Sequence, residues 1–294
     1  MYATAADGQR LYVQHLRAAT RPRGVALLLH AMMVDRRSMD RPEGQGFGSL
    51  LAARGFEVLL ADYRGHGESR PLPRVGAAWS YDDLVRLDTP ALLAFARQRF
   101  PRLPLFVCGQ SLGGHVTLAA VGTDVAPEPD GVVALSAATY DPRLVDGLRT
   151  HLRRVVWVGG MEALARTLGR FPSRHLRLGP ADEAAPYVHD LWRFTTRGWF
   201  ARDGRDYLLA MAHVHCPVLG VYASGDRLLA PLSTARAWLR HAGSPDLEYR
   251  VVGGGAGGVA HDPGHMDLVG DPRCRPAWEG VARWLEARCP RSEP

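Results

Sequence analysis

The chain has 294 residues, 46% of them hydrophobic, and a formal net charge of +6. This length and composition provide a sizeable core, and α/β proteins often run this far as one core plus an insertion. No apolar run approaches the roughly 20 residues that span a bilayer. The N-terminus lacks the charged start and apolar stretch of a secretory signal, so we expect a cytoplasmic protein.

The charge and the cysteines argue against nucleic-acid and metal sites. All 36 basic residues are arginine and are interleaved with acidic residues, whereas a nucleic-acid-binding protein needs a basic stripe or a reader motif. The four cysteines form no C-x-x-C pair and no Cys/His ligand spacing. We therefore predict no metal, no cofactor and no nucleic-acid partner.

Apolar runs alternate with helical patterns along most of the chain. Residues 2–16 predict two short strands around a turn. Later runs are mostly apolar throughout, as in parallel strands covered on both faces, at residues 25–29, 57–61, 105–108, 132–135, 218–223 and 247–252. The predicted helices between them lie at residues 47–54, 81–100, 115–121, 233–241 and 277–288. This alternation favours a mostly parallel sheet flanked by helices, with right-handed crossovers.

The helical pattern over residues 81–100 is interrupted. The sequence Asp88-Thr89-Pro90 is typical of a helix start, with a capping residue and a proline at the first helical position. We therefore predict a short helix that ends before these residues and a longer helix that follows them.

The alternation stops between residues 138 and 215, where several segments are helical in pattern and no buried strand is convincing. An insertion this long between two sheet strands is best explained as a helical cap. We predict an α/β core from residues 1–137 and 216–294 and a cap from residues 138–215. Twelve arginines against eight carboxylates make this cap mildly basic, which favours an anionic substrate or an acidic acyl-carrier partner.

The sequence GQSLGG, residues 109–114, lies between a predicted strand and a predicted helix. Strand, G-x-S-x-G and helix form the context of a nucleophile elbow, a sharp turn that holds the serine hydroxyl above the sheet. Side chains two residues before and after the serine would collide, which explains Gly109 and Gly113. Ser111 is therefore the candidate nucleophile.

The order of the chain supplies partners for Ser111. Asp226 follows the predicted strand at 218–223, and His265 follows the last predicted strand. Each candidate comes after the carboxyl end of a strand, where open parallel sheets place their sites. Nucleophile, acid and histidine occur in this order in one triad-bearing fold. His265 would take the Ser111 proton, and Asp226 would hold the imidazole.

These motifs resemble the α/β-hydrolase superfamily almost from end to end. GQSLGG, SGD at Asp226, GH at His265 and the sequence DYRGHGES at 62–69 fall where the family has them. DYRGHGES matches the family pattern D-x-R-G-x-G-x-S. Within the superfamily the chain is most similar to serine hydrolases of unassigned substrate with a long helical cap. It departs from the pattern at His30-Ala31, where many members have His-Gly, and this change affects the oxyanion loop.

The resemblance implies the oxyanion donors and the alternatives to the acid. By family position the donors are the backbone amides of Met32 and Leu112, with Met33 as a substitute. Some relatives carry the acid after the strand that corresponds to 132–135, which makes Asp141 the alternative to Asp226.

Other polar residues near the motifs compete with the candidates or have structural roles. His261 precedes His265 by four residues but lacks a preceding glycine, so we favour His265. We expect His30 to hold its loop by hydrogen bonds. Asp62 and Arg64 are expected to brace the DYRGHGES loop rather than touch substrate.

The large side chains of the cap carry most of the information on specificity. We expect most of them to form the cap core and two or three to line a pocket; they are Trp157, Tyr187, Trp192, Phe194, Trp199, Phe200 and Tyr207. Trp192 and Trp199, together with Met33, are the predicted substrate-binding residues.

The sequence thus predicts a cofactor-free serine hydrolase that cleaves a carboxylic ester through an acyl-enzyme. One alternative keeps the acyl-enzyme and changes the substrate or acceptor, as in a thioesterase or an acyltransferase of a biosynthetic pathway. Others use the same scaffold for cofactor-free lyase or peroxidase chemistry, or for a ligand receptor that retains the triad, because a fold does not establish a function.

Overall fold

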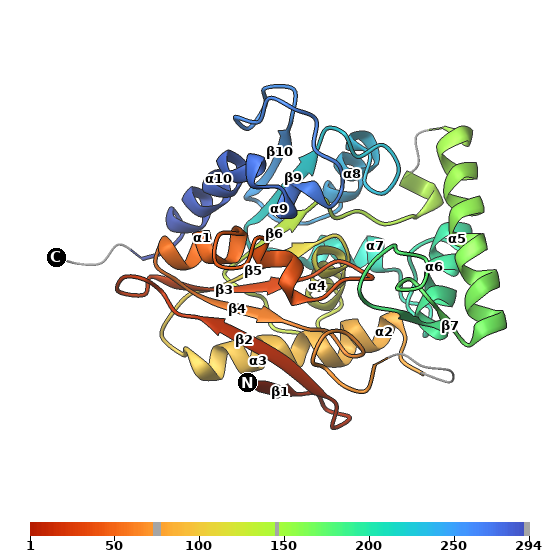
Figure 1. The fold of residues 1–294 in the computed structure, drawn as a ribbon, viewed down its shortest axis with the longest axis horizontal. Coiled ribbons are helices and arrows are strands. Elements are labelled where there is room, and N and C mark those ends of the chain that lie inside the picture. Colours follow the sequence, from red (N-terminus) through yellow and green to blue (C-terminus); the bar gives the residue numbers. More distant parts are fainter. Residues whose placement is uncertain (73–77, 145–146, 291–294) are drawn as a thin grey trace.

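The computed structural model describes residues 1–72, 78–144 and 147–290 (Figure 1). The strands are β1 (Tyr2–Thr4), β2 (Arg10–Leu16), β3 (Gly24–Leu29), β4 (Phe56–Ala61), β5 (Leu105–Gln110), β6 (Gly131–Leu135), β7 (Arg170–Phe171), β8 (Glu183–Ala184), β9 (Val218–Ala223) and β10 (Leu247–Val252). Eight of them form one sheet in the order β1-β2-β4-β3-β5-β6-β9-β10. Only the β1–β2 and β2–β4 pairs in this sheet are antiparallel, so the predicted mostly parallel sheet is confirmed.

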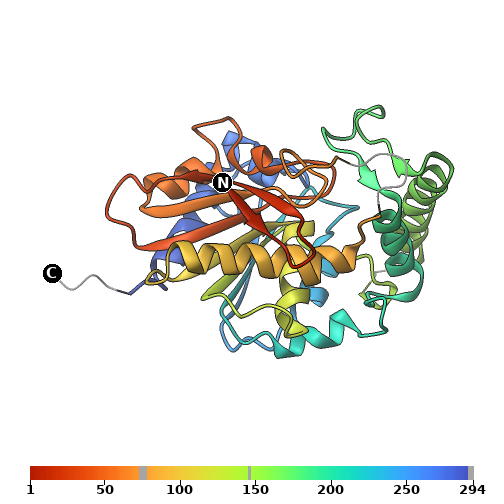
Figure 2. The same cartoon turned by 90° about the horizontal axis from the view of Figure 1, so that it is seen from below.

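Helices cover both faces of this sheet (Figures 1 and 2). They are α1 (Phe47–Ala53), α2 (Tyr81–Asp83), α3 (Thr89–Arg99), α4 (Leu112–Gly122), α5 (Leu148–Leu168), α6 (Ala185–Arg197), α7 (Tyr207–Ala210), α8 (Leu232–Leu239), α9 (Asp267–Gly270) and α10 (Arg275–Glu286). α1, α9 and α10 pack on one face, and α3, α4 and α8 pack on the other. Within the described ranges, none of the helices combines the length and the hydrophobicity that crossing a membrane requires.

Short helical turns complete the structure. The 3-10 turns are η1 (Arg36–Asp40), η3 (Pro142–Leu144), η4 (Met211–His213) and η5 (Pro272–Cys274), and the π-helical turn is η2 (Leu84–Asp88).

Strand β3 explains why the apolar runs become parallel strands. All of its residues are buried, and successive side chains enter opposite clusters. Val25 and Leu27 pack on the side of α3 and α4, whereas Ala26 and Leu28 pack on the side of α1 and α10. A strand that is apolar on both faces loses contact with water only between two layers of helices.

The predicted short helix and longer helix are present as α2 and α3, and α3 begins at Thr89, but the side chain of Asp88 does not cap it. The helix continues from Tyr81 to Arg99, because η2 joins α2 to α3. The wider π turn accommodates Pro90, whose ring would otherwise clash with the preceding helical turn. Thr89 Oγ1 also donates to the Leu84 carbonyl at 2.9 Å.

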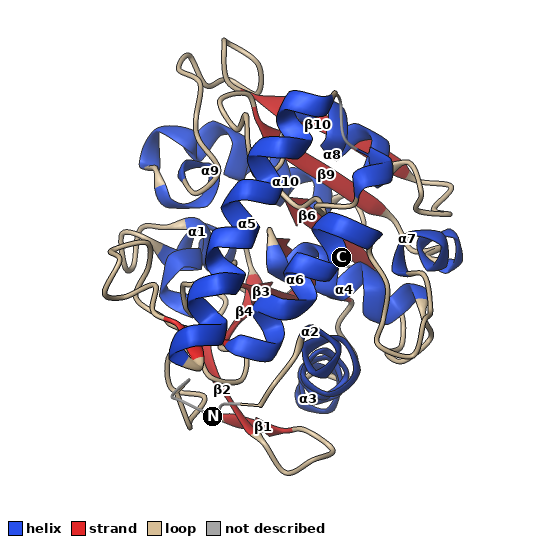
Figure 3. Ribbon diagram, turned by 90° about the vertical axis from the view of Figure 1, so that its right-hand side faces the viewer, coloured by secondary structure: helices blue, strands red, loops and turns tan. Residues whose placement is uncertain are grey.

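Residues 138–215, which we call the cap segment, are mostly helical and lie beyond the carboxyl ends of the central strands (Figures 1 and 3). α5 packs along α6, and β7 pairs with β8 in a separate two-stranded ladder. The sequence pattern predicted the helices but missed the ladder, because strands of two residues show no alternation. The division into two domains stays a prediction.

Candidate active site

Ser111 lies at the turn between β5 and α4. Its backbone has a φ of +48° and a ψ of −109°, a strained conformation that costs on the order of 1–3 kcal/mol. The Ser111 amide donates to the Leu135 carbonyl at 2.8 Å, which ties the turn to β6. The strand, turn and helix of the predicted elbow are therefore present.

The glycines around Ser111 are needed because a side chain would have no room. A Cβ on Gly109 would lie 2.3 Å from the carbonyl carbon of Gly113. A Cβ on Gly113 would lie 2.5 Å from the carbonyl oxygen of Leu29 in β3. Both collisions involve backbone atoms, so no rotation of a side chain relieves them, as the sequence analysis predicted.

Asp226 and His265 meet at the carboxyl edge of the sheet. Oδ2 of Asp226 lies 2.5 Å from Nδ1 of His265, and the amides of Leu229 and Ala230 donate to the same carboxylate at 3.0 Å each. Burial favours a higher pKa for Asp226, but the hydrogen bond and charge of His265, with the two amides, lower it overall. Asp226 therefore stays an acceptor, and Nε2 of His265 is the nitrogen left for chemistry.

The two alternative residues are engaged elsewhere. Nε2 of His261 lies 3.4 Å from the carboxylate of Asp271. Asp141 is fully buried, forms an ion pair with Arg143 and accepts the backbone amide of Trp199 at 2.8 Å. The geometry thus favours the Asp–His pair described above over these alternatives.

Met32 and Leu112, whose amides are the predicted oxyanion donors, lie close to Ser111. Leu112 is the first residue of α4, where a backbone N–H has no acceptor within its own helix. Both residues line a cavity at Ser111. The amide of Met33 instead donates to Glu183 at 2.5 Å, so the suggestion that Met33 substitutes for Met32 was wrong.

The cavity at Ser111 has a volume of about 20 Å³. Its remaining lining is mostly apolar and aromatic: Met32, Leu112, His115, Ala138, Thr139, Tyr140, Tyr187, Leu191, Phe194 and Leu229. A volume this small holds about one water molecule, so a substrate enters only when the lining moves. A larger hollow of about 310 Å³, lined by Gln14, Asp40 and Pro180 among others, does not reach Ser111.

Two of the predicted substrate contacts are buried away from this cavity. Trp199 is completely buried, and its Nε1 donates to the hydroxyl of Tyr81 at 3.2 Å. Met33 is also buried and lies against the cap segment, where its carbonyl accepts from the Ala181 amide. Neither residue lines the cavity in this structure, because the two side chains pack between the core and the cap segment, and their contact with substrate stays a prediction.

Helix α6 places three of its side chains at the cavity. Tyr187, Leu191 and Phe194 line it, and their spacing of four and three residues places them on one face of the helix. Trp192 follows Leu191 and points about 100° away from it. A Cβ on Gly159 of α5 would lie 3.1 Å from the Trp192 ring, so Trp192 packs between the two helices. Trp192 does not line the cavity in this structure, and its contact with substrate stays a prediction.

A protein-family model matches most of the chain, on both sides of Ser111. The model of the family described as serine aminopeptidase, S33, matches residues 21–263. The chain belongs to this family. The match includes Ser111 and Asp226 and ends two residues before His265.

Curated relatives of this S33 family protein match a part of the chain. Lipase member N of Mus musculus is 28% identical over 133 residues, which cover 41% of this chain and 33% of the relative. Lipase member M of Mus musculus is 29% identical over 113 residues, which cover 36% of this chain and 26% of that relative. The chain thus spans a third or less of the length of these relatives.

Solved structures match over nearly the whole chain. A soluble variant of monoglyceride lipase from Saccharomyces cerevisiae has a TM-score of 0.69 at 17% identity, covering 99% of this chain and 95% of that chain. A monoacylglycerol lipase from Paleococcus ferrophilus has a TM-score of 0.63 at 15% identity, covering 95% of this chain and 99% of that chain. These likenesses show the α/β-hydrolase fold, as predicted.

His115 is a residue at the site that the sequence analysis missed. It lies one turn after Ser111 on α4 and lines the cavity. Its Nδ1 lies 2.8 Å from the Tyr81 hydroxyl, which also accepts from Nε1 of Trp199. Burial, and to a smaller extent the nearby His265, lowers the pKa of His115 to about 3. The ring of His115 is therefore neutral.

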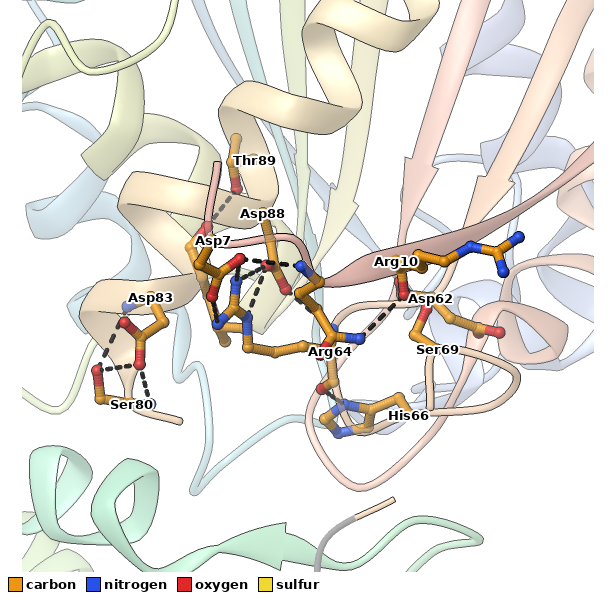
Figure 4. A network of polar contacts seen from close by, with 12 residues as sticks. Asp7, Arg10, Asp62, Arg64, His66, Ser69, Ser80, Asp83, Asp88 and Thr89 are labelled. Carbon is orange, nitrogen blue, oxygen red and sulfur yellow. Dashed lines mark hydrogen bonds and ion pairs between the residues drawn. The ribbon is translucent and has the colours of Figure 1, made fainter. Parts of the chain in front are cut away.

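The DYRGHGES loop is braced by buried ion pairs, as predicted. The Asp62 carboxylate accepts the Arg36 amide at 2.8 Å and its guanidinium at 2.7 Å. Arg64 donates to Asp88 at 2.7 Å and to Asp7 at 2.8 Å (Figure 4). Burial raises the pKa of Asp88 to about 6, although Arg64 opposes this increase. These carboxylates fix the backbone of the loop.

His30 connects this loop to the oxyanion loop. Its Nε2 accepts the Tyr63 amide at 3.1 Å, and its Nδ1 lies 2.7 Å from the Ala31 carbonyl. Burial, with a smaller contribution from His66, lowers the pKa of His30 to about 3, so the ring is neutral. The predicted structural role of His30 is confirmed.

Proposed function

We propose that this protein is a serine hydrolase that cleaves carboxylic esters through an acyl-enzyme, with Ser111 as the nucleophile. The observation that carries the proposal is the 2.5 Å contact between Asp226 and His265, at the sheet edge where Ser111 adopts its strained turn. Membership of the S33 family supports it. The lipases among its relatives and structural neighbours favour an ester as the bond that is cleaved.

The triad would act in two steps, the acylation of Ser111 and the hydrolysis of the acyl-enzyme. Nε2 of His265 takes the proton of Ser111 as the serine oxygen attacks the ester carbonyl, and Asp226 stabilises the imidazolium. The imidazolium then gives this proton to the departing alkoxide, which leaves as the alcohol. Water repeats the attack on the acyl-enzyme, and the carboxylic acid leaves as Ser111 regains its proton.

The oxyanion of each tetrahedral intermediate needs preformed donors. We assign this role to the amides of Met32 and Leu112, because both residues line the cavity at Ser111. Removing one such donor typically lowers kcat by about 10²–10³-fold. The aromatic and aliphatic lining of the cavity fits an apolar acyl or alkyl group.

The proposed substrate is a neutral ester. The basic cap segment favoured an anionic substrate or an acyl carrier, but half of its arginines are ion-paired with acidic residues of the same segment. These are Arg143, Arg166, Arg170, Arg193, Arg202 and Arg205. Their charge is largely compensated, which weakens the field that an anionic partner would meet.

Turnover of a p-nitrophenyl ester series tests this function. We expect wild-type turnover, and a loss of about 10³-fold or more in kcat for His265→Ala. His261→Ala is the matched control and should keep wild-type kcat. An acyl thioester series at low and high salt is run beside it. Faster thioester turnover that falls with salt would replace the ester proposal by a thioesterase.

A further inference from the structure

Glu183 reaches from the cap segment into the oxyanion loop of the core. Its Oε1 accepts the amide of Met33 at 2.5 Å, across 150 residues of sequence. The carbonyl of Met33 accepts the amide of Ala181 at 3.0 Å. Met33 is thus held at both ends by residues 179–183, which we call the strap.

The strap lies directly on the backbone of the oxyanion loop. A Cβ on Gly179 would lie 2.2 Å from the carbonyl oxygen of Met33, so the two backbones approach as closely as glycine allows. Met33 itself has a φ of +63°, a left-handed conformation that a methionine rarely adopts. A strained residue of this kind persists only where its surroundings hold it.

A buried histidine, His66, also contacts the carboxylate of Glu183. Glu183 and His66 are both completely buried, with Nε2 of His66 3.2 Å from Oε1 of Glu183 and Nδ1 2.9 Å from the Arg64 carbonyl. Both ring nitrogens thus face oxygen acceptors, which suits the protonated imidazolium. Burial opposes this charge, but Glu183 and the carbonyl raise the pKa of His66 overall.

We propose that Glu183 is a positioning residue for the oxyanion hole, a role that rests on the serine hydrolase function proposed above. By binding the Met33 amide, it fixes the peptide that joins Met32 to Met33. The amide of Met32 belongs to the preceding peptide, so Glu183 acts on it indirectly: a Met33 that is held in place limits how far the neighbouring Met32 can move away from Ser111. Glu183 belongs to the cap segment. The oxyanion hole is therefore complete only when the strap is bound to Met33.

Kinetics of three variants test this role. Glu183→Ala should lower kcat on a p-nitrophenyl ester by about 10- to 100-fold with KM within about 3-fold of wild type, because an oxyanion donor is misplaced. Glu183→Gln keeps an acceptor oxygen for Met33 and should stay within about 3-fold of wild-type kcat. Glu162→Ala removes another buried carboxylate of the cap segment, one that pairs with Arg166, and should leave kcat unchanged.

Hydrogen exchange gives a second readout that needs no activity. In wild type the Met33 amide should be protected, and in Glu183→Ala a peptide covering residues 30–35 should exchange about tenfold faster or more. Peptides from β5 should keep wild-type exchange in the same variant. This local pattern separates loss of the Met33 contact from general unfolding.

The outcomes separate the two proposals. If Glu183→Ala keeps wild-type kcat and wild-type exchange while wild type hydrolyses esters, the positioning role is wrong and the hydrolase function stands. If Glu183→Gln loses as much kcat as Glu183→Ala, an acceptor for Met33 is not what matters, and the role is also wrong. If wild type hydrolyses no ester, the hydrolase function fails, and the catalytic role of Glu183 fails with it.

Discussion

The backbone at Ser111 is held by close packing on both sides of the turn. Gly109 approaches the first turn of α4, and Gly113 approaches the Leu29 carbonyl in β3. The Ser111 amide adds a hydrogen bond to β6. These contacts offset a strain on the order of 1–3 kcal/mol and keep the serine at the end of β5.

Gly113→Ala should lower the free energy of unfolding by about 2–4 kcal/mol, because its Cβ would collide with backbone that cannot rotate away. Gly160→Ala on α5 is the matched control, since nothing lies within 4 Å of its added Cβ. It should be neutral or stabilise by up to about 1 kcal/mol. Urea unfolding measures both, and equal values for the two variants would contradict this account of the elbow.

The Tyr81 hydroxyl joins two buried polar groups, His115 and the indole of Trp199. Tyr81→Phe should therefore lower the free energy of unfolding by about 1–3 kcal/mol, because both groups lose their partner. The hydroxyl of Tyr222 is buried without a partner among the described residues. Tyr222→Phe should cost less than about 0.5 kcal/mol, and thermal unfolding compares the pair. A larger loss of unfolding free energy in Tyr222→Phe than in Tyr81→Phe would contradict the role given to the Tyr81 hydroxyl.

At the scale of elements, hydrophobic pattern predicted most of the fold. The apolar run of β3 required a helix layer on each face, and both layers are present. At Pro90 the pattern predicted the start of α3 but not the π turn that joins it to α2 without a break. The pattern also left open which face of α6 meets the core, because this depends on packing against α5.

The face of α6 predicts which side chain controls acyl length. Phe194→Ala should shift the optimum of a p-nitrophenyl ester series to longer chains, because Phe194 lines the cavity at Ser111. Trp192→Ala should lower the melting temperature and keep the wild-type optimum, because Trp192 packs on α5. A shift of the optimum in Trp192→Ala alone would restore Trp192 as a substrate contact.

At the scale of the whole molecule, the core and the cap segment share one site. Chain order placed Ser111, Asp226 and His265 after strands of one sheet, so these candidates followed from the sequence. Glu183 did not follow, because its contact with Met33 joins residues 150 positions apart and no motif marks it. Such contacts depend on how the cap segment packs, which a pattern of single elements does not encode.

Buried histidines should make the stability of the molecule depend on pH. Burial lowers the pKa of His30 and of His115 to about 3, so the unfolded chain binds more protons below its ordinary histidine pKa of about 6.5. Their contribution is present above about pH 6.5 and is lost as pH falls. His66 has a raised pKa, so its effect on stability has the opposite pH dependence. Its contribution to stability is lost as pH rises through that pKa.

The contributions of His30 and His115 to the free energy of unfolding should fall between pH 7 and pH 5, whereas those of His66 and of Asp88, whose pKa is raised to about 6, change in the opposite direction. Each neutral buried histidine accounts for roughly 1–2 kcal/mol over this interval. His115→Gln should reduce the slope, whereas the same change at exposed His175 should leave it unchanged. Urea unfolding at several pH values measures these slopes, and an unchanged slope in His115→Gln would contradict the neutral burial of this ring.

Intact-mass labelling with a fluorophosphonate tests the central claim most directly, because only an activated serine reacts rapidly. The account predicts one adduct on wild type, mapped to Ser111 and absent from Ser111→Ala. The adduct should form more slowly in His265→Ala and at the wild-type rate in His261→Ala. A folded wild-type protein that forms no adduct, or forms it on a residue other than Ser111, would contradict the serine hydrolase assignment.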